Sequence, residues 1–407
     1  GGGCIYTPAR DVWETLATAA AGTGPFTITM RGVDAGGRMG EAAPLTMRVA
    51  EEPITGGLYY WNAGAGTIDR FEFGVRGARA ETYLATRNTG AAMCVGCHAL
   101  SRDGRRISVG SDTPTETLHV FDVATRALVW TTDTPAPPLV PSPTEPNFVA
   151  WESTGAWLVG SGLDGLIIRD GTTGIRVAGP MGGRASEMPD VSPDGNHIVF
   201  VRTDPGSIIF PGLVDLSSVS SGRIHRLDWS GTEWVDPGAD LVANSGNNYY
   251  PTYTPDGEWI VYNHSPSNVP SMGMDASSAM TAYVPDAELW VIPAGGGGGI
   301  ELVRAGGLAD AWPKFDPTHY VSEGRPLFWF AWSSRRAFGL RYDESGPHSP
   351  QLWMAAFDPT EAAAGREPAF PAFRLPFQAI ETGNHIAQWV TNIERLACTT
   401  DAECSGE

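Results

Sequence analysis

Short runs of apolar residues recur along this chain, and turns rich in Pro, Asp and Gly separate them. The clearest example is the turn at 189–195 (PDVSPDG), which the apolar run at 197–200 (HIVF) follows. Short runs bounded by turn residues predict β-strands joined by tight hairpins. No run approaches the ~20 consecutive apolar residues of a membrane-spanning helix, so no transmembrane segment is predicted.

This strand, turn and strand form an internal repeat. Strong copies also occur at 98–104 (HALSRDG) and 251–257 (PTYTPDG), and weaker ones lie at 149–158 and 313–330. A second apolar pattern follows the copies at a variable distance, and its clearest examples are 118–122, 289–292 and 352–355. Together the two patterns predict four antiparallel strands per unit, which is typical of a propeller blade.

The copies begin near residues 98, 149, 189, 251 and 313, which gives five blades. The sixth blade is predicted to be split between the two ends of the repeat region. Residues 58–71 match later strands without a first strand, and 386–390 match a first strand without later ones. Joining them closes the ring and removes exposed sheet edges. The fold class is therefore all-β, with a six-bladed β-propeller over residues 51–397.

The two flanking segments differ from the repeat. Within residues 1–50, Trp13, 26–30 and 45–49 alternate as sandwich strands do, which predicts a partial immunoglobulin- or fibronectin-like module. A simple N-terminal hairpin packed on the propeller is the open alternative. Residues 398–407 form a tail in which Cys398 and Cys404 close a short loop and predict a disulfide. Two free thiols remain possible there.

The Ser-Pro-Asp-Gly and Thr-Pro-Asp-Gly turns resemble those of the TolB-like (PD40) propeller family. The resemblance covers most of residues 98–332 at the level of whole blades. It implies a six-bladed propeller but no single activity, because such scaffolds host binding and catalytic roles alike.

Composition changes this picture in two ways. The 50 Gly and 32 Pro indicate many turns and few long helices. The formal net charge of -19 argues against a nucleic-acid partner, because phosphate binding needs clustered cations.

The chain begins with neither Met nor a signal peptide, which predicts a processed or clipped N-terminus.

One motif carries recognisable chemistry. Residues 94–98 read Cys-Val-Gly-Cys-His, the C-x-x-C-H signature of covalent haem c attachment. Two thiols at this spacing form thioethers with the haem vinyl groups, and the adjacent His binds the iron. Chance gives this pentapeptide on the order of once in a thousand such chains. The sequence therefore predicts one haem c, attached at Cys94 and Cys97, with His98 as the proximal axial ligand. A redox dithiol, a zinc site and a plain disulfide are the alternatives.

Topology narrows the second axial ligand. His98 begins a first strand, so the haem is expected where the first strands begin, near the central channel. His385 precedes the first strand of the closing blade and aligns with Gly96, which makes it the favoured distal ligand. Met188 aligns with Cys97 and is the alternative. The insert at 264–287, with its three methionines, is a possible lid, and an open sixth position also remains.

These features predict an exported monohaem cytochrome that exchanges electrons with a partner redox protein or cytochrome assembly. No catalytic residue is predicted, so the chain is expected to be an electron carrier rather than an enzyme. Haem c attachment outside the bacterial cytoplasm and the tail disulfide both indicate a periplasmic, outer-membrane-associated or extracellular location. The alternatives are a haem-dependent oxidoreductase or sensor with an open sixth site, and a structural or binding propeller in which haem is a staple.

Overall fold

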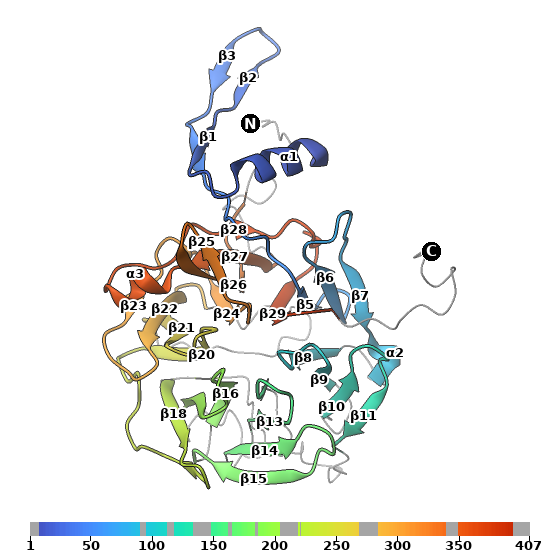
Figure 1. Cartoon of the computed structure of the whole chain (residues 1–407), viewed down its shortest axis with the longest axis vertical. Coiled ribbons are helices and arrows are strands. Elements are labelled where there is room, and N and C mark those ends of the chain that lie inside the picture. The colour runs from blue at the N-terminus through green and yellow to red at the C-terminus, as the bar shows by residue number, and fades with distance from the viewer. Residues whose placement is uncertain are drawn as a thin grey trace.

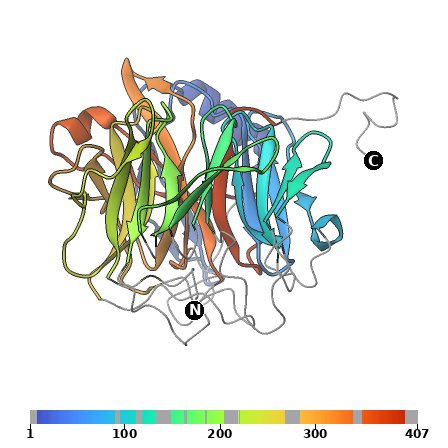
Figure 2. The same ribbon diagram turned by 90° about the horizontal axis from the view of Figure 1, so that it is seen from below.

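Six antiparallel sheets stand as blades around a common centre in the computed structural model (Figure 1). Figure 2 shows the strands of neighbouring blades standing side by side. The structure describes residues 8–89, 95–111, 118–132, 148–161, 165–183, 186–203, 219, 221–267, 284–338 and 349–393.

The first three blades follow one another along the chain. The first consists of β8 (Val95–Leu100), β9 (Arg106–Ser111), β10 (Leu118–Asp122) and β11 (Leu128–Thr131). The second consists of β12 (Val149–Trp151), β13 (Trp157–Gly160), β14 (Leu166–Asp170) and β15 (Arg176–Met181). The third consists of β16 (Ser186–Val191), β17 (His197–Arg202), β18 (Arg223–Trp229) and β19 (Trp234–Val235).

The remaining blades complete the ring. The fourth consists of β20 (Asn247–Tyr253), β21 (Trp259–Ser265), β22 (Glu288–Pro293) and β23 (Ile300–Glu301). The fifth consists of β24 (Asp310–Phe315), β26 (Arg325–Ser334), β27 (Gln351–Phe357) and β28 (Phe373–Arg374), and β25 (Tyr320–Ser322) also pairs with β26. The closing blade consists of β29 (Asn384–Val390), β5 (Gly57–Asn62), β6 (Thr67–Glu72) and β7 (Glu81–Leu84). The predicted six-bladed, all-β fold with a split closing blade is confirmed.

The repeated Asp-Gly turn explains why the blades are visible in the sequence. In the third blade the Ser192 hydroxyl donates to Asp194 Oδ1, and Gly195 adopts a φ of 73°. The same turn recurs at 101–104 and 254–257. Each turn therefore needs a hydroxyl, a carboxylate and a residue that tolerates positive φ, which are the residues the repeat supplies.

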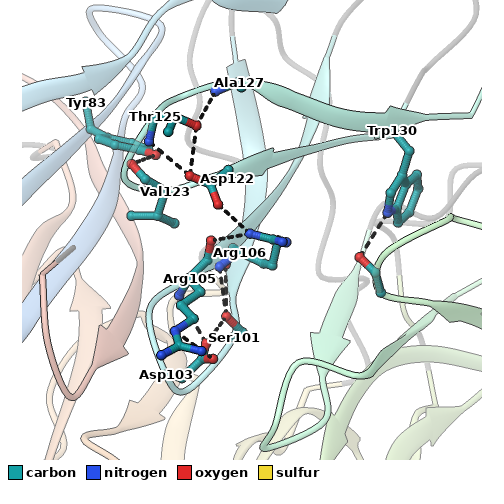
Figure 3. A network of polar contacts seen from close by, with 11 residues as sticks. Tyr83, Ser101, Asp103, Arg105, Arg106, Asp122, Val123, Thr125, Ala127 and Trp130 are labelled. Carbon is teal, nitrogen blue, oxygen red and sulfur yellow. Dashed lines mark hydrogen bonds and ion pairs between the residues drawn. The ribbon is translucent and has the colours of Figure 1, made fainter. Parts of the chain in front are cut away.

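The first blade is fixed on both sides (Figure 3). The Tyr83 hydroxyl of the closing blade donates to the Val123 carbonyl at 2.8 Å. On the other side, Nε1 of Trp130 donates to the Gly171 carbonyl of the second blade at 3.1 Å. These two bonds link the first blade, which contains Cys97 and His98, to both of its neighbours.

The N-terminal segment differs from its prediction at one element. Residues 10–20 form α1 (Arg10–Ala20), so the predicted strand at Trp13 is wrong. Val12, Leu16 and Ala20 recur at a four-residue spacing, which favours a helix over a strand. Two small sheets follow, formed by β1 (Phe26–Ile28) with β4 (Leu45–Met47) and by β2 (Arg31–Val33) with β3 (Met39–Glu41). The resemblance to an immunoglobulin-like module stays a prediction.

The other two helices are short connections. α2 (Thr86–Thr89) leads from the closing blade towards the first blade, and α3 (Pro359–Ala363) follows β27 in the fifth. Within the described residues no helix combines the length and apolar character needed to cross a membrane.

Candidate functional site

A ring of bulged residues surrounds the channel near the side where the first strands begin. In five blades the first strand carries a non-glycine residue in the left-handed region, followed by a shift in strand register. These residues are Cys97, Met188, Tyr250, Trp312 and Ile386, with φ of 44°, 51°, 51°, 54° and 51°. Such bulges redirect side chains, and left-handed backbone costs non-glycine residues about 1–2 kcal/mol each.

The five bulged residues line one pocket, together with Phe148 from the second blade. The pocket has a volume of about 500 Å³, counting the space at its open end. Aromatic and aliphatic side chains dominate its wall, and beside the motif residues its polar groups belong to Lys314, Gln388 and the aromatic residues Tyr250 and Trp312. This is a mostly apolar cavity to which all six blades contribute.

His98 is the most unusual group at this pocket. Its side chain lines the cavity and is only 2% exposed, and neither ring nitrogen has a hydrogen-bond partner among the described residues. Burial lowers the pKa of His98 from 6.5 to about 4, although a contact with the Tyr59 backbone opposes the shift. The ring is therefore neutral at pH 7 and has a lone pair, as metal ligation requires.

His98 is the residue directly after the bulge in the first blade. The same position carries Pro189, Pro251 and Pro313 in the third, fourth and fifth blades. A proline there has no side-chain polar atom to satisfy. An unpartnered polar group in the same place destabilises the fold by about 1–3 kcal/mol unless a ligand satisfies it.

Cys97 places a thiol at the same cavity. Its side chain is half-buried and lines the pocket beside His98. Gly110 on the neighbouring strand lies beside it, and a Cβ at Gly110 would be in ordinary van der Waals contact with the Cys97 Cβ at 3.5 Å. Cys94 lies outside the described residues, as do Cys398 and Cys404 with their predicted disulfide. The described half of the motif, a thiol beside a buried neutral imidazole in an apolar pocket, fits the attachment and ligation of a haem.

The two candidate distal ligands occupy different environments. The sequence alignment that pairs His385 with Gly96 and Met188 with Cys97 is confirmed by the strand registers. Met188 is 3% exposed and lines the pocket with Cys97 and His98. At this pocket the closing blade contributes Ile386, the neighbour of His385.

His385 itself packs into the aromatic surroundings of the closing blade. Its ring centroid lies 5.2 Å from that of Trp61 and 5.8 Å from that of Trp312, and its side chain is fully buried. A Cβ at Gly383 would lie 2.8 Å from Nε2, so this nitrogen is turned towards its own strand end. Burial, with a smaller contribution from Arg335, lowers the pKa of His385 to about 3.

Two histidines elsewhere in the ring, His225 and His264, have polar partners. Both ring nitrogens of His225 lie 2.8 Å from carboxylates, those of Asp236 and Asp240. Nδ1 of His264 lies 2.9 Å from the Asn248 amide oxygen. The possible lid methionines Met272, Met274 and Met280 lie outside the described residues. Among the residues that are described, no three His, Cys, Asp or Glu side chains gather as around a metal ion.

Sequence reasoning missed a charged pair inside the channel. Lys314 Nζ lies 2.6 Å from Asp190 Oδ1, joining the fifth blade to the third. The sequence does mark one member of this pair, since Lys314 is the only lysine in the chain.

The chain matches no known family model and no curated protein sequence. Among solved structures it is similar to TolB from Acinetobacter baumannii, with 12% identity, a TM-score of 0.50, and coverage of 94% of this chain and 86% of that chain. Hydrazine synthase from Kuenenia stuttgartiensis shows 14% identity and a TM-score of 0.43, covering 75% of this chain and 74% of that chain. The similarity to TolB supports a TolB-like propeller fold and, at 12% identity, nothing about function. The similarity to hydrazine synthase has too low a TM-score to carry an argument.

Proposed function

We propose that this protein is a monohaem c-type cytochrome on a propeller scaffold, which exchanges electrons with a partner redox protein or assembly. Cys94 and Cys97 would hold the haem by thioether bonds, and His98 would be the proximal axial ligand. Bound there, the haem supplies one-electron redox chemistry.

The buried imidazole of His98 is the observation that carries this proposal. A fully buried histidine without a hydrogen-bond partner among the described residues is unfavourable, and iron ligation would satisfy one of its nitrogens. Its neighbour Cys97 lines the same pocket, as thioether attachment beside the ligand requires. A chance C-x-x-C-H sequence would not account for the unpartnered imidazole.

The contacts support Met188 over His385 as the second ligand. Met188 lines the cavity with His98, whereas Nε2 of His385 is turned towards Gly383. Methionine ligation raises the reduction potential relative to ligation by two histidines. The choice therefore changes which partners the protein can reduce.

Electron transfer is favoured over catalysis by the pocket wall. Apart from the motif, its described side chains with an ionisable group are Tyr250 and Lys314, and Lys314 is already paired with Asp190. This leaves little acid–base chemistry for converting a substrate. An exported location belongs to the same proposal, since haem c attachment takes place outside the bacterial cytoplasm.

Absorption spectroscopy of the purified protein tests the proposal. A reduced haem c α-band, insensitive to carbon monoxide and cyanide, would support a six-coordinate electron carrier. Ready binding of carbon monoxide would instead favour an oxidoreductase or sensor with an open sixth site. Absence of the α-band would refute the proposal, provided that the protein was produced with haem c maturation and that a known cytochrome c matured in parallel.

A further inference from the structure

A second pocket continues the channel towards the Asp-Gly turns. It has a volume of about 530 Å³, counting the space at its open end, and residues from all six blades line it. Val149, Lys314 and Gln388 also line the pocket beside His98, so the two cavities adjoin along the channel. Its wall is more polar than that of the first pocket and includes three charged side chains, those of Arg102, Asp190 and Lys314.

Asp190 is saturated by its protein partners. Its Oδ1 receives Lys314 Nζ at 2.6 Å. Its Oδ2 accepts the Thr252 hydroxyl at 3.0 Å and the Tyr253 amide at 2.8 Å. This carboxylate is therefore a fixed acceptor for Lys314 and has little remaining capacity for a second cation.

Arg102 enters the same pocket from the first blade and has no carboxylate within ion-pair distance among the described residues. Its guanidinium makes one long hydrogen bond, from an Nη to the Val191 carbonyl at 3.4 Å. Glu152, the other acidic group near it, accepts the Ser153 and Thr154 hydroxyls of its own turn. Most of the five guanidinium donors are thus available to a ligand.

The balance of charge in the pocket indicates that such a ligand would carry a negative charge. Among the side chains that line the pocket, two cations, Arg102 and Lys314, face one carboxylate, Asp190, which leaves one positive charge in the lining. Glu152 lies outside the lining and also attracts Arg102, from its own turn. The rest of this acidic chain repels anions, with a formal net charge of -19. A surplus cation in a recess of an acidic protein is the opposite of what general solubility requires.

The remaining wall indicates the body of the ligand. Apolar and aromatic side chains line the cavity, among them Leu100, Trp151 and Phe315. A planar guanidinium matches a planar carboxylate with two parallel hydrogen bonds. A doubly charged phosphate would bring surplus negative charge close to Asp190.

We propose that this pocket binds a small organic monocarboxylate, with the Arg102 guanidinium as the main contact and an apolar body against the aromatic wall. Lys314, held by Asp190, would add a second and weaker attraction. This site does not depend on the haem, because none of its three charged residues belongs to the attachment motif.

Isothermal titration calorimetry of the purified protein with benzoate tests the inference. Benzamide is the uncharged probe of the same shape, and inorganic phosphate is the alternative anion. Arg102→Gln is the test variant, and Arg105→Gln, at an exposed arginine of the same turn, is the matched control. We expect saturable benzoate binding that Arg102→Gln weakens by about tenfold to hundredfold, the usual effect of losing hydrogen bonds to a charged group. Arg105→Gln should leave the affinity unchanged.

Four outcomes would overturn the inference. Equal binding of benzamide would mean an apolar cleft without carboxylate recognition. Equal or tighter binding of phosphate would mean a general anion site. Unchanged benzoate affinity in Arg102→Gln, or no benzoate binding by a protein with normal thermal unfolding, would also refute the site. Lys314→Met provides a second variant, with an expected loss smaller than that of Arg102→Gln.

Discussion

Replacing His98 with leucine should have opposite effects on stability with and without haem. In the Cys94→Ala, Cys97→Ala background no haem can be attached, so both ring nitrogens of His98 stay buried without partners. His98→Leu then removes the unsatisfied groups and should stabilise the protein. In the haem-bearing protein the same change removes the proximal ligand and should destabilise it.

The size of the stability change on His98→Leu follows from the burial of the two ring nitrogens. Each unsatisfied buried polar group costs about 1–3 kcal/mol, and the change of shape to leucine returns up to about 1.5 kcal/mol. With two such groups on His98, a net stabilisation of about 0.5–6 kcal/mol is therefore expected in the haem-free background at pH 8. His225→Leu is the matched control, because both nitrogens of that buried ring have carboxylate partners. It should destabilise the protein in both backgrounds.

The pH dependence of the free energy of unfolding provides an independent test of the burial of His98. Burial lowers the pKa of His98 from 6.5 to about 4, so the unfolded chain takes up a proton more readily than the folded one. Stability is then fully present above about pH 6.5 and falls as the pH drops towards 4. Linkage gives a loss of about 2 kcal/mol between pH 8 and pH 5 from this residue alone. In the haem-free background His98→Leu should remove that loss.

Urea unfolding followed by tryptophan fluorescence measures both effects at pH 8 and pH 5. Six proteins are compared: the parent, His98→Leu and His225→Leu, each with and without haem. The reasoning is refuted if His98→Leu destabilises the haem-free protein as much as His225→Leu does. That result would mean that His98 is satisfied by the fold itself.

Two further predictions concern the ring and the second ligand. Gly104 and Gly324 share a φ near 73°, but a Cβ at Gly104 would lie 2.5 Å from the Asn392 carbonyl oxygen, whereas none of the surrounding atoms lies within 4 Å at Gly324. In urea unfolding, Gly104→Ala should therefore destabilise the protein by about 1–3 kcal/mol more than Gly324→Ala does, and equal effects would contradict the closure contact. Met188→Leu should lower the reduction potential and open the iron to carbon monoxide, whereas His385→Leu should do neither. The reverse result in spectroelectrochemistry would restore His385 as the ligand.

The blades could be predicted because each of the clearest ones repeats a local signal. A Ser or Thr, an Asp and a Gly at fixed spacing form the turn at 192–195 through contacts within a few residues. The split closing blade followed from counting those signals and from the need to pair two open edges. Helix α1 differs from the predicted strand because its apolar residues Val12, Leu16 and Ala20 follow a four-residue spacing and do not alternate.

The functional geometry was less accessible because it depends on register between strands. Nothing in the local sequence around Cys97, Met188 or Tyr250 marks a left-handed bulge, since none of these residue types favours positive φ. The pair formed by Lys314 and Asp190 joins residues 124 positions apart. The motif itself was predictable as chemistry, but the burial of His98 required the packed ring.

Mass spectrometry of the peptide that contains residues 94–98 tests the central claim most directly. The account predicts that the peptide carries one covalently bound haem, with both cysteines consumed as thioethers. Recovery of the peptide with two free thiols, or with a disulfide between Cys94 and Cys97, from protein matured alongside a correctly assembled cytochrome c would contradict it.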